Sequence, residues 1–323
     1  MSSSSSSSSA VSTAGLRVGF VGLGTMGQAM ALNLHAHRIA NGNPPLAVYN
    51  RTASKAQPLE AKGAVVHASP AAVAANSDVV FISLFNGDAV KQVVGEILDS
   101  LAGAPATDQP LVIADTTTVH PSVPTWIAEQ VAQRQASLSR PVQFSQTPVW
   151  GAPPAAVAAK LVLVTSGSAS ELIEAIAVPA FARVALGCGP DVARAAKFKI
   201  LGNFMIAAII EAMGEAFAVA DESGIGRELY LDFIKQLFPV PSFVAYGSRM
   251  VEQGGEASKT QVSFTVPGGM KDVGYAIDVA KDVGMRLPIA ELAYEHLQWV
   301  SDNGDPSWDW SSLAFALRKS AQQ

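Results

Sequence analysis

The sequence has little cysteine, little charge and no long apolar run. Its one cysteine, Cys188, excludes an internal disulfide and a cysteine-based zinc site; a reducing, cytoplasmic location and no metal are expected. Only 15% of the residues are charged, the net charge is −5 and no block of Lys or Arg occurs, so we expect no nucleic-acid or membrane partner. The most apolar run, 205–210, lies between Asn203 and Glu211 and is far shorter than the roughly 18–20 residues of a membrane span.

The chain is long and apolar enough for two folded domains. It has 323 residues, of which 49% are hydrophobic, and about 150 residues per domain predicts two cores. Met1 and the serine tract 2–9 have nothing to bury, so we expect residues 1–15 to form a disordered tail. This tail has no apolar signal segment and no arginine before Arg17.

Short apolar runs alternate with helical patterns through the first half of the chain. The expected strands are residues 16–21, 46–49, 64–67, 78–84, 111–114, 142–149 and 161–165, and the expected helices are 26–36, 70–75 and 88–98. Strands alternating with helices predict an α/β fold: a doubly wound, Rossmann-like parallel sheet with helices on both faces.

The second half of the chain reads as helical. One long helix is expected over residues 191–223, between Pro190 and Gly224. Further helices follow, with breaks expected near residues 239–241, 254–255, 267–269 and 288. The sequence therefore predicts an α/β domain over residues 16–189 and an all-helical domain over 190–323, joined by the long interdomain helix.

A glycine-rich turn follows the first expected strand. Its residues are Gly22-Leu23-Gly24-Thr25-Met26-Gly27. Gly22 permits a tight turn, Gly24 lets the backbone approach a pyrophosphate, and Gly27 lets the helix pack closely on the strand. The N–H groups at the start of the helix would bind the anion. The motif lies after a strand and before a helix, which favours a dinucleotide site over an ordinary glycine-rich turn.

The end of the second strand indicates which dinucleotide binds. An Asp or Glu there would accept hydrogen bonds from the ribose of NAD, but the chain has Asn50-Arg51-Thr52 with Lys55 following. Arg51, Thr52 and Lys55 can donate to a 2′-phosphate, so NADP(H) is favoured over NAD(H). The alternative is that Arg51 and Lys55 belong to a solvated helix start.

Two further loops should lie at the carboxyl edge of the sheet, where ligands bind in this architecture. One is Leu84-Phe85-Asn86, and the other contains Thr116, Thr117 and Thr118. Their side chains could hold a nicotinamide or a substrate. Each loop alone could equally be a helix cap or a turn.

The long helix carries two lysines near its start, and they face nearly opposite ways. Lys199 has Asn203 one turn further on, whereas Lys197 has Leu201 there. An ammonium beside an amide could give a proton to a carbonyl oxygen while the amide orients that oxygen. From spacing alone, a surface lysine beside a core amide is the commoner arrangement.

Taken together, these motifs resemble the β-hydroxyacid dehydrogenase family. That family includes 3-hydroxyisobutyrate dehydrogenase and the glyoxylate/succinic semialdehyde reductases, with 6-phosphogluconate dehydrogenases and imine reductases as more distant relatives. The resemblance implies that Lys199 is the catalytic acid/base, that Asn203 orients the reacting oxygen, and that Thr117 and Thr118 contact nicotinamide and substrate. It also implies that Lys271 lies near the nicotinamide, that Phe264 lines the substrate pocket, and that the protein is a homodimer or homotetramer.

Two departures from the family pattern concern the substrate. Trp150-Gly151-Ala152 stands where the family usually has Ser-Gly-Gly, whose serine and N–H groups bind a carboxylate. We expect these three residues to line the substrate, although Trp150 could instead be a core side chain beside a glycine. The second departure is Pro267-Gly268-Gly269, just before Lys271, which should alter the loop over the nicotinamide.

The expected function is an NADPH-dependent reductase that transfers hydride to a small semialdehyde or keto acid, or the reverse oxidation of a β-hydroxyacid. One alternative keeps the fold and reduces an imine, as imine reductases and reductive aminases do, although such relatives typically lack the lysine. A second alternative is a non-catalytic NADP-binding scaffold.

Overall fold

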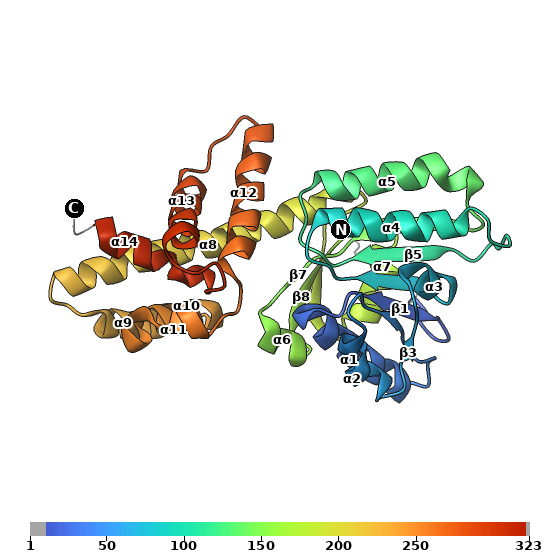
Figure 1. Ribbon diagram of the computed structural model, residues 1–323, viewed down its shortest axis with the longest axis horizontal. Helices are drawn as coiled ribbons and strands as arrows, with labels where there is room; N and C mark the ends of the chain where they lie inside the picture. Colours follow the sequence, from blue (N-terminus) through green and yellow to red (C-terminus); the bar gives the residue numbers. More distant parts are fainter. Residues whose placement is uncertain (1–10, 321–323) are drawn as a thin grey trace, which may run out of the picture. The chain divides into compact units, whose positions relative to one another are not determined.

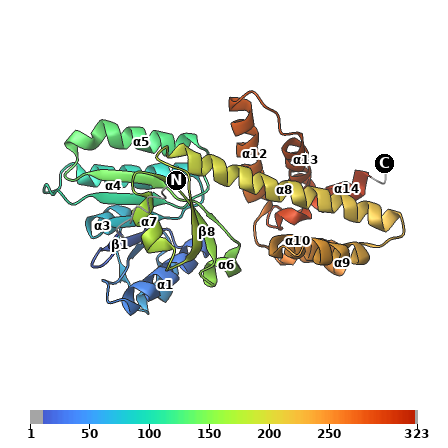
Figure 2. The same ribbon diagram turned by 180° about the vertical axis from the view of Figure 1, so that it is seen from behind.

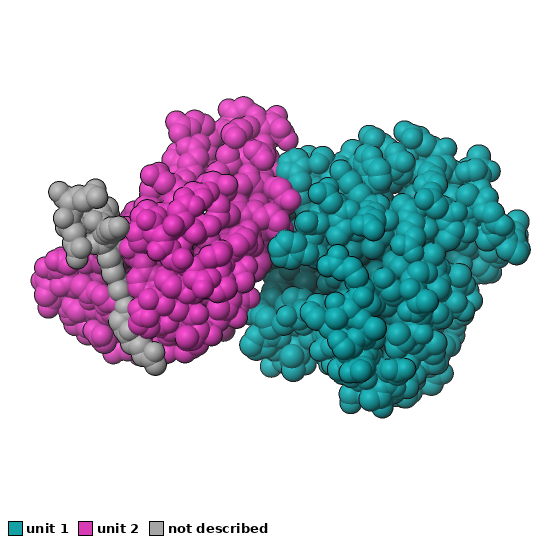
Figure 3. All heavy atoms as spheres, viewed as in Figure 1, with its two compact units in different colours: residues 1–199 teal, residues 200–323 magenta. Residues whose placement is uncertain are grey.

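The computed structural model describes residues 11–320, and the chain divides into two compact units after Lys199 (Figure 3). Most of the predicted disordered tail, residues 1–10, lies outside the described residues. Within the described part, the Gly15 N–H donates to Asn43 Oδ1 at 2.9 Å. The domain boundary expected near Gly189 stays a prediction.

The first unit is built on a nine-stranded sheet (Figure 1). The strands are β1 (Val18–Val21), β2 (Ala47–Tyr49), β3 (Val65–Val66), β4 (Val79–Ile82), β5 (Leu111–Asp115), β6 (Val142–Gln146), β7 (Val149–Trp150), β8 (Leu161–Gly167) and β9 (Ala182–Gly187). Their order is β3-β2-β1-β4-β5-β6-β8-β7, with β9 beside β8. The six strands from β3 to β6 are parallel, which confirms the Rossmann-like class.

Helices cover both faces of this sheet. They are α1 (Thr25–Ala40), α2 (Gln57–Glu60), α3 (Pro70–Ala75), α4 (Gly87–Leu101), α5 (Ser122–Arg134), α6 (Pro153–Val157) and α7 (Ser170–Ala177). Figure 1 shows α4 and α5 on one face and α1 and α2 on the other. Side chains alternate between two cores along the strands: in β4, Val79 and Phe81 join one core and Val80 and Ile82 the other.

The far side of the sheet differs from the sequence prediction. The strand expected over residues 142–149 is two strands, β6 and β7, because Pro148 has no N–H with which to continue the ladder. Strand β8 runs antiparallel to both β6 and β7, so the sheet is mixed rather than wholly parallel. The sequence also left α5, α7 and β9 unassigned. The pattern of β9 is weak for a strand, because two of its six residues are the exposed Arg183 and the glycine Gly187.

The second unit is helical. Its elements are α8 (Ala193–Glu222, which begins in the first unit), α9 (Arg227–Leu237), α10 (Pro241–Val251), α11 (Ala257–Thr260), α12 (Val266–Asp282), α13 (Pro288–Asn303) and α14 (Ala314–Ser320). Figure 2 shows α9 and α10 lying along each other. The break expected near residues 267–269 falls just before them, at 261–265 between α11 and α12, and Pro267 occupies the first turn of α12, where its missing N–H costs no hydrogen bond.

Helix α8 is long and apolar enough, by length and composition, to cross a membrane, with a mean hydropathy of 1.5 over 18 residues. The run of apolar residues expected to be too short for a span, 205–210, lies within this helix, and the mean hydropathy reaches this value over a longer window that includes polar residues. The criterion is weak evidence for a span, because a core helix of a folded domain meets it too. Lys199, Asn203 and Glu211 of α8 are buried within the protein.

Candidate active site

The turn between β1 and α1 has a backbone geometry that requires glycine. Gly22 has φ of +96°, and a Cβ there would lie 2.2 Å from the Ser83 carbonyl oxygen. A Cβ at Gly27 would lie 2.1 Å from the Gly22 carbonyl oxygen. A Cβ at Gly24 would meet no atom within 4 Å, so this side of the turn is open. The cradle therefore fits the pyrophosphate of a dinucleotide, which could approach the backbone at Gly24.

The first turn of α1 adds the electrostatic part of this cradle. Thr25 and Met26 begin the helix, and its first N–H groups have no partner within the helix. No acidic residue stands in this turn, so the positive end of the helix dipole is not neutralised. An anion bound at Gly24–Gly27 would be stabilised by these N–H groups.

Asn50 links this turn to the end of β2. Its Oδ1 accepts the N–H of Leu23 at 2.8 Å, and its Nδ2 donates to the Thr52 carbonyl at 2.9 Å. The side chain of Asn50 thus fixes the backbone of two loops. An aspartate here could accept from Leu23 but could not donate to the Thr52 carbonyl.

The polar residues after β2 are exposed. Arg51, Thr52 and Lys55 all face solvent, and Gln28 Nε2 of α1 donates to the Lys55 carbonyl at 2.8 Å. That hydrogen bond links the turn at Lys55 to α1, the helix whose first turn completes the glycine-rich cradle. Two cations without a carboxylate at the strand end suit a phosphate group. Their exposure is equally compatible with a solvated helix start.

Thr117 connects the two loops at the carboxyl edge. Its Oγ1 accepts the N–H of Leu84 at 3.0 Å, its own N–H donates to Asp115 Oδ1 at 3.0 Å, and its carbonyl accepts from Gln146 Nε2 at 2.9 Å. Thr117 is buried. The loops after β4 and β5 are therefore held as one unit by hydrogen bonds to a single residue. Sequence reasoning missed Gln146, because its role depends on the β5–β6 pairing.

Asp115 is a buried acid in this network. Its side chain is fully buried, and burial raises its pKa to about 7, although hydrogen bonds with Thr117 and Gln146 oppose the rise. Within the described residues, Asp115 Oδ2 and Gln146 Oε1 have no hydrogen-bond partner. The Asp115 carboxyl therefore gains or loses its proton near neutral pH.

The Leu84–Asn86 loop divides between two roles. Asn86 caps α4, because its Oδ1 accepts the N–H of Ala89 at 3.0 Å. Phe85 is 75% exposed, and Leu84 is half-buried. An exposed phenylalanine at the carboxyl edge offers an apolar surface to a ligand. Asn86 is therefore a helix cap, one of the two roles that the sequence left open. Phe85 is exposed and could contact a ligand.

Lys199 and Lys197 differ in environment. The side chain of Lys199 is 6% exposed, whereas Lys197 faces solvent. Lys199 Nζ lies 5.3 Å from the centroid of the Trp150 ring, and this ring packs edge-on against Phe198 with centroids 5.2 Å apart. The structure thus places Trp150 next to the lysine that the sequence selects, rather than in an apolar core.

Asn203 is held by an acid that sequence reasoning did not select. Asn203 Nδ2 donates to Asp272 Oδ2 at 2.5 Å, and Lys271 Nζ donates to Asp272 Oδ1 at 2.8 Å. Asp272 is 1% exposed, and Lys271 also lies 5.1 Å from the Tyr275 ring centroid. One buried carboxylate therefore joins two predicted site residues from α8 and α12. The Lys271-Asp272 pair was the only sequence signal for it.

Phe264 lies just before α12 and packs against Trp310, with ring centroids 5.1 Å apart. Gly268 and Gly269 make this packing possible, because a Cβ at either would lie 2.9 Å from the Phe264 or Trp310 ring. Asp309 Oδ2 accepts the N–H of Phe264 at 3.1 Å. The expectation that 267–269 forms an altered loop is therefore corrected: these glycines are helical and make room for aromatic rings.

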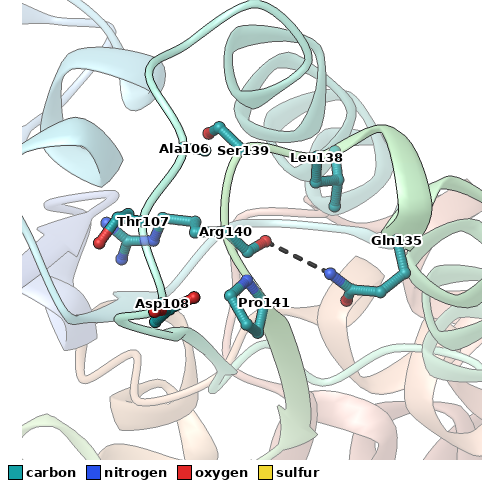
Figure 4. A pocket seen from close by; sticks show the side chains of 8 residues that line it. All are labelled: Ala106, Thr107, Asp108, Gln135, Leu138, Ser139, Arg140 and Pro141. Atoms are coloured by element: carbon teal, nitrogen blue, oxygen red, sulfur yellow. Dashed lines mark hydrogen bonds between the residues drawn. The ribbon is translucent and has the colours of Figure 1, made fainter.

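A shallow pocket of about 370 Å³ lies at the opposite edge of the sheet (Figure 4). Its lining residues are Ala106, Thr107, Asp108, Gln135, Leu138, Ser139, Arg140 and Pro141. These residues precede β5 and β6, so the pocket is at the amino ends of the strands. Ligands of this architecture bind at the carboxyl ends, and none of the predicted site residues lines the pocket.

The strand order, together with a glycine cradle at the carboxyl edge, is the architecture of dinucleotide-dependent oxidoreductases. Comparison with known families agrees. Residues 17–188 match the NAD binding domain of 6-phosphogluconate dehydrogenase, and residues 193–317 match the NAD-binding domain of NADP-dependent 3-hydroxyisobutyrate dehydrogenase. The chain belongs to this family of NAD(P)-dependent, hydroxyacid dehydrogenase-like oxidoreductases.

Individual relatives cover nearly the whole chain. The NADH-dependent oxidoreductase ucdB of Aspergillus ustus is 31% identical, with 91% of this chain and 96% of that protein aligned. Glyoxylate/succinic semialdehyde reductase 1 of Arabidopsis thaliana is 27% identical over 95% of this chain and 100% of its own length.

Solved structures share the fold. The 3-hydroxyisobutyrate dehydrogenase of Mycobacterium tuberculosis with L-serine has a TM-score of 0.74 at 22% identity, covering 94% of this chain and 99% of its own. A reductive aminase from Aspergillus terreus has a TM-score of 0.57 at 20% identity, with the same coverage.

Proposed function

We propose that this protein is an NADPH-dependent reductase of a small aldehyde or ketone, and that it also catalyses the reverse oxidation of the alcohol. Lys199 gives a proton to the carbonyl oxygen, or takes it back in the reverse direction, and Asn203 orients that oxygen. When bound, the nicotinamide supplies or accepts the hydride. Family membership supports the reaction class, and the residue roles are our proposal.

The observation that carries this proposal is the burial of a lysine and an amide one helical turn apart on α8. Both Lys199 and Asn203 are 6% exposed, and an ionisable group is rarely buried to that extent without a partner or a function. The hydrogen bond from Asn203 Nδ2 to Asp272 fixes the plane of the amide, and an amide NH2 has a second hydrogen that can donate to a carbonyl oxygen. A held amide can position a substrate without paying the entropy of ordering its own side chain.

We also propose that the cofactor is NADP(H) rather than NAD(H). Arg51 and Lys55 are exposed next to a strand end that has Asn50 in place of an acid. The Aspergillus ustus relative is named NADH-dependent, so the cofactor preference needs a direct measurement. We expect kcat/KM to be higher with NADPH, and Arg51→Glu to invert that preference, because a carboxylate would repel the 2′-phosphate.

A substrate panel tests the function itself. Aldehydes, ketones, keto acids and cyclic imines would be assayed with NADPH and with NADH by following the absorbance of the reduced cofactor. Reduction of carbonyls but not imines supports the proposal. Faster reduction of imines would favour an imine reductase, and consumption of no member of the panel despite tight NADPH binding would favour a scaffold.

We propose that the protein forms a homodimer or homotetramer through the helical unit. On α9, Leu229, Phe233 and Leu237 are exposed by 64%, 43% and 61%, and their spacing of four residues places them on one face of the helix. Light scattering would give the molar mass in solution. A monomer at micromolar concentration would contradict this proposal. The cytoplasmic location and the boundary near Gly189 are retained as predictions.

A further inference from the structure

The last residue of β7, Trp150, lies with its aromatic ring near Lys199. Trp150 ends the strand, in register with Val162 of β8, and Gly151 follows with φ of +138°. A Cβ at Gly151 would lie 2.6 Å from Leu161 Cδ2. This turn therefore needs glycine, and its conformation fixes the direction in which the chain presents the Trp150 ring.

This segment is poor in hydrogen-bond donors. Residues 150–154 read Trp-Gly-Ala-Pro-Pro, without a hydroxyl, an amide side chain or a charge. Pro153 and Pro154 open the five-residue helix α6 and have no N–H, and the next two N–H groups, of Ala155 and Ala156, donate to the Ala152 carbonyl at 2.9 and 3.2 Å. A carboxylate needs several donors in place of water. The other donors of residues 150–154 are the indole N–H of Trp150 and the backbone N–H groups of Gly151 and Ala152, none of which is charged, so this segment offers a carboxylate less than the serine-containing segment of the family does.

The Trp150 ring is suited to a different group. It lies 5.3 Å from Lys199 Nζ and packs edge-on on Phe198, at 89°. Trp150 is partly exposed, so part of the indole remains open to a ligand. The face of an indole carries negative electrostatic potential, which attracts the ammonium and repels a carboxylate. An alkyl or aryl group beside Lys199 would instead gain apolar contact with the ring.

We propose that Trp150 is a specificity-determining residue, which selects uncharged carbonyl substrates with an apolar or aromatic substituent over substrates that carry a carboxylate. The inference rests on the proposed reductase function and narrows its substrate class. It departs from the semialdehyde or keto acid that the family resemblance implies.

Matched substrates test the proposal in the wild-type protein. Pentanal and 4-oxobutanoate are aldehydes of similar length that differ in the carboxylate, methyl 4-oxobutanoate masks that charge, and phenylacetaldehyde adds a ring. We expect kcat/KM with NADPH to be roughly tenfold or more higher for the three neutral aldehydes than for 4-oxobutanoate. A preference for 4-oxobutanoate would overturn the inference while leaving the reductase function intact. Reduction of none of the four would instead count against the proposed function.

Variants then assign the preference to one side chain. Trp150→Ser should lower the ratio of kcat/KM for phenylacetaldehyde to that for 4-oxobutanoate by roughly tenfold or more, and Trp150→Phe should keep most of it. Trp126 is a matched control, because Lys91 Nζ lies 5.3 Å from its ring on another part of the unit. Trp126→Ser should leave the ratio unchanged. Since the ratio compares two substrates on one variant, a loss of folded protein does not affect it. An unchanged ratio in Trp150→Ser would overturn the proposal.

Discussion

The sheet unit and the helical unit bury polar side chains of different kinds. At the carboxyl edge of the sheet the buried groups are largely hydroxyls and amides, joined by hydrogen bonds to the backbone; they include Thr116, Thr117, Ser145, Gln146, Thr147, Thr165 and Ser166. The helical unit buries an amide and serines too, but it also buries three carboxylates, each with a cationic neighbour. Glu211 pairs with His296 at 2.7 Å, Asp272 with Lys271 at 2.8 Å, and Asp309 lies 4.0 Å from Arg249.

This difference follows from what each unit must do. The sheet unit has to bring its backbone close to a dinucleotide at its carboxyl edge, and there glycines and hydrogen bonds from neutral side chains shape the loops. Most backbone groups of a helix are paired within the helix, so in the helical unit side chains supply much of what holds loops and site residues in place. Buried ion pairs are costly to break, and they hold Asn203 and Phe264 in place. Backbone changes should therefore damage the first unit most, and removal of a carboxylate the second.

The largest effect on cofactor binding is expected for Gly27→Ala. Its Cβ would lie 2.1 Å from the Gly22 carbonyl oxygen, so α1 must move away from the turn. NADPH affinity, measured by fluorescence titration, should fall on the order of 100-fold. Gly95→Ala is the control, because its Cβ would meet nothing within 4 Å in α4, and it should stabilise the protein by about 0.5–1 kcal/mol. Unchanged NADPH affinity in Gly27→Ala would contradict a backbone-built cradle.

In the helical unit, a loss of stability rather than of cofactor affinity is expected for Asp309→Ala. Asp309 accepts the N–H groups of Ser263, Phe264 and Ser311 at 2.8, 3.1 and 3.0 Å and is fully buried. Its removal should lower the free energy of unfolding by about 3–5 kcal/mol, measured by urea denaturation.

Asp305→Ala is the matched control for this loss. Asp305 also accepts a backbone N–H, that of Ser307 at 2.7 Å, but it is exposed, so its removal should lower the free energy of unfolding much less than removal of Asp309. Equal losses in the two variants would show that burial of the carboxylate is not what matters.

The smallest effect concerns the one buried acid of the sheet network. The pKa of Asp115 is raised to about 7 from an ordinary value of 3.8. Between pH 4 and 7 the unfolded chain loses this proton before the folded protein does, so this group lowers stability as the pH rises through that window. Asp115→Asn should remove this contribution, on the order of a few kcal/mol. Urea unfolding from pH 4 to 8 measures it, and parallel curves for both proteins would contradict the shifted pKa.

The parts of the fold that sequence predicted are those with strong local patterns. The parallel strands β1, β4 and β5, the helix α3 and the long helix α8 are confirmed close to their expected bounds, because buried apolar runs and glycine or proline boundaries are local signals. The antiparallel pairing of β8 and the helical start at Pro267 were not predicted. Strand direction depends on distant chain segments, and proline permits both a helix start and a break.

For the site, the sequence could select residues but not their partners. Asn50 and Thr117 were selected because each follows the end of an expected strand. Their hydrogen bonds to Leu23 and Leu84 depend on how separate loops pack together. Asp272 and Asp309 were missed as anchors, since the site residues that they hold, Asn203 and Phe264, are 69 and 45 positions away in the sequence. The assignment of individual residues to cofactor and substrate stays a prediction.

The central claim is that Lys199 moves the proton in carbonyl reduction. Its most direct test is the kcat of Lys199→Ala for the best substrate of the panel, with the NADPH dissociation constant measured on the same protein. We expect kcat to fall on the order of 100- to 10,000-fold, with NADPH affinity unchanged, while Lys197→Ala, which alters an exposed lysine, keeps its turnover. Turnover within a few-fold of wild type in Lys199→Ala, with normal cofactor binding, would contradict the claim.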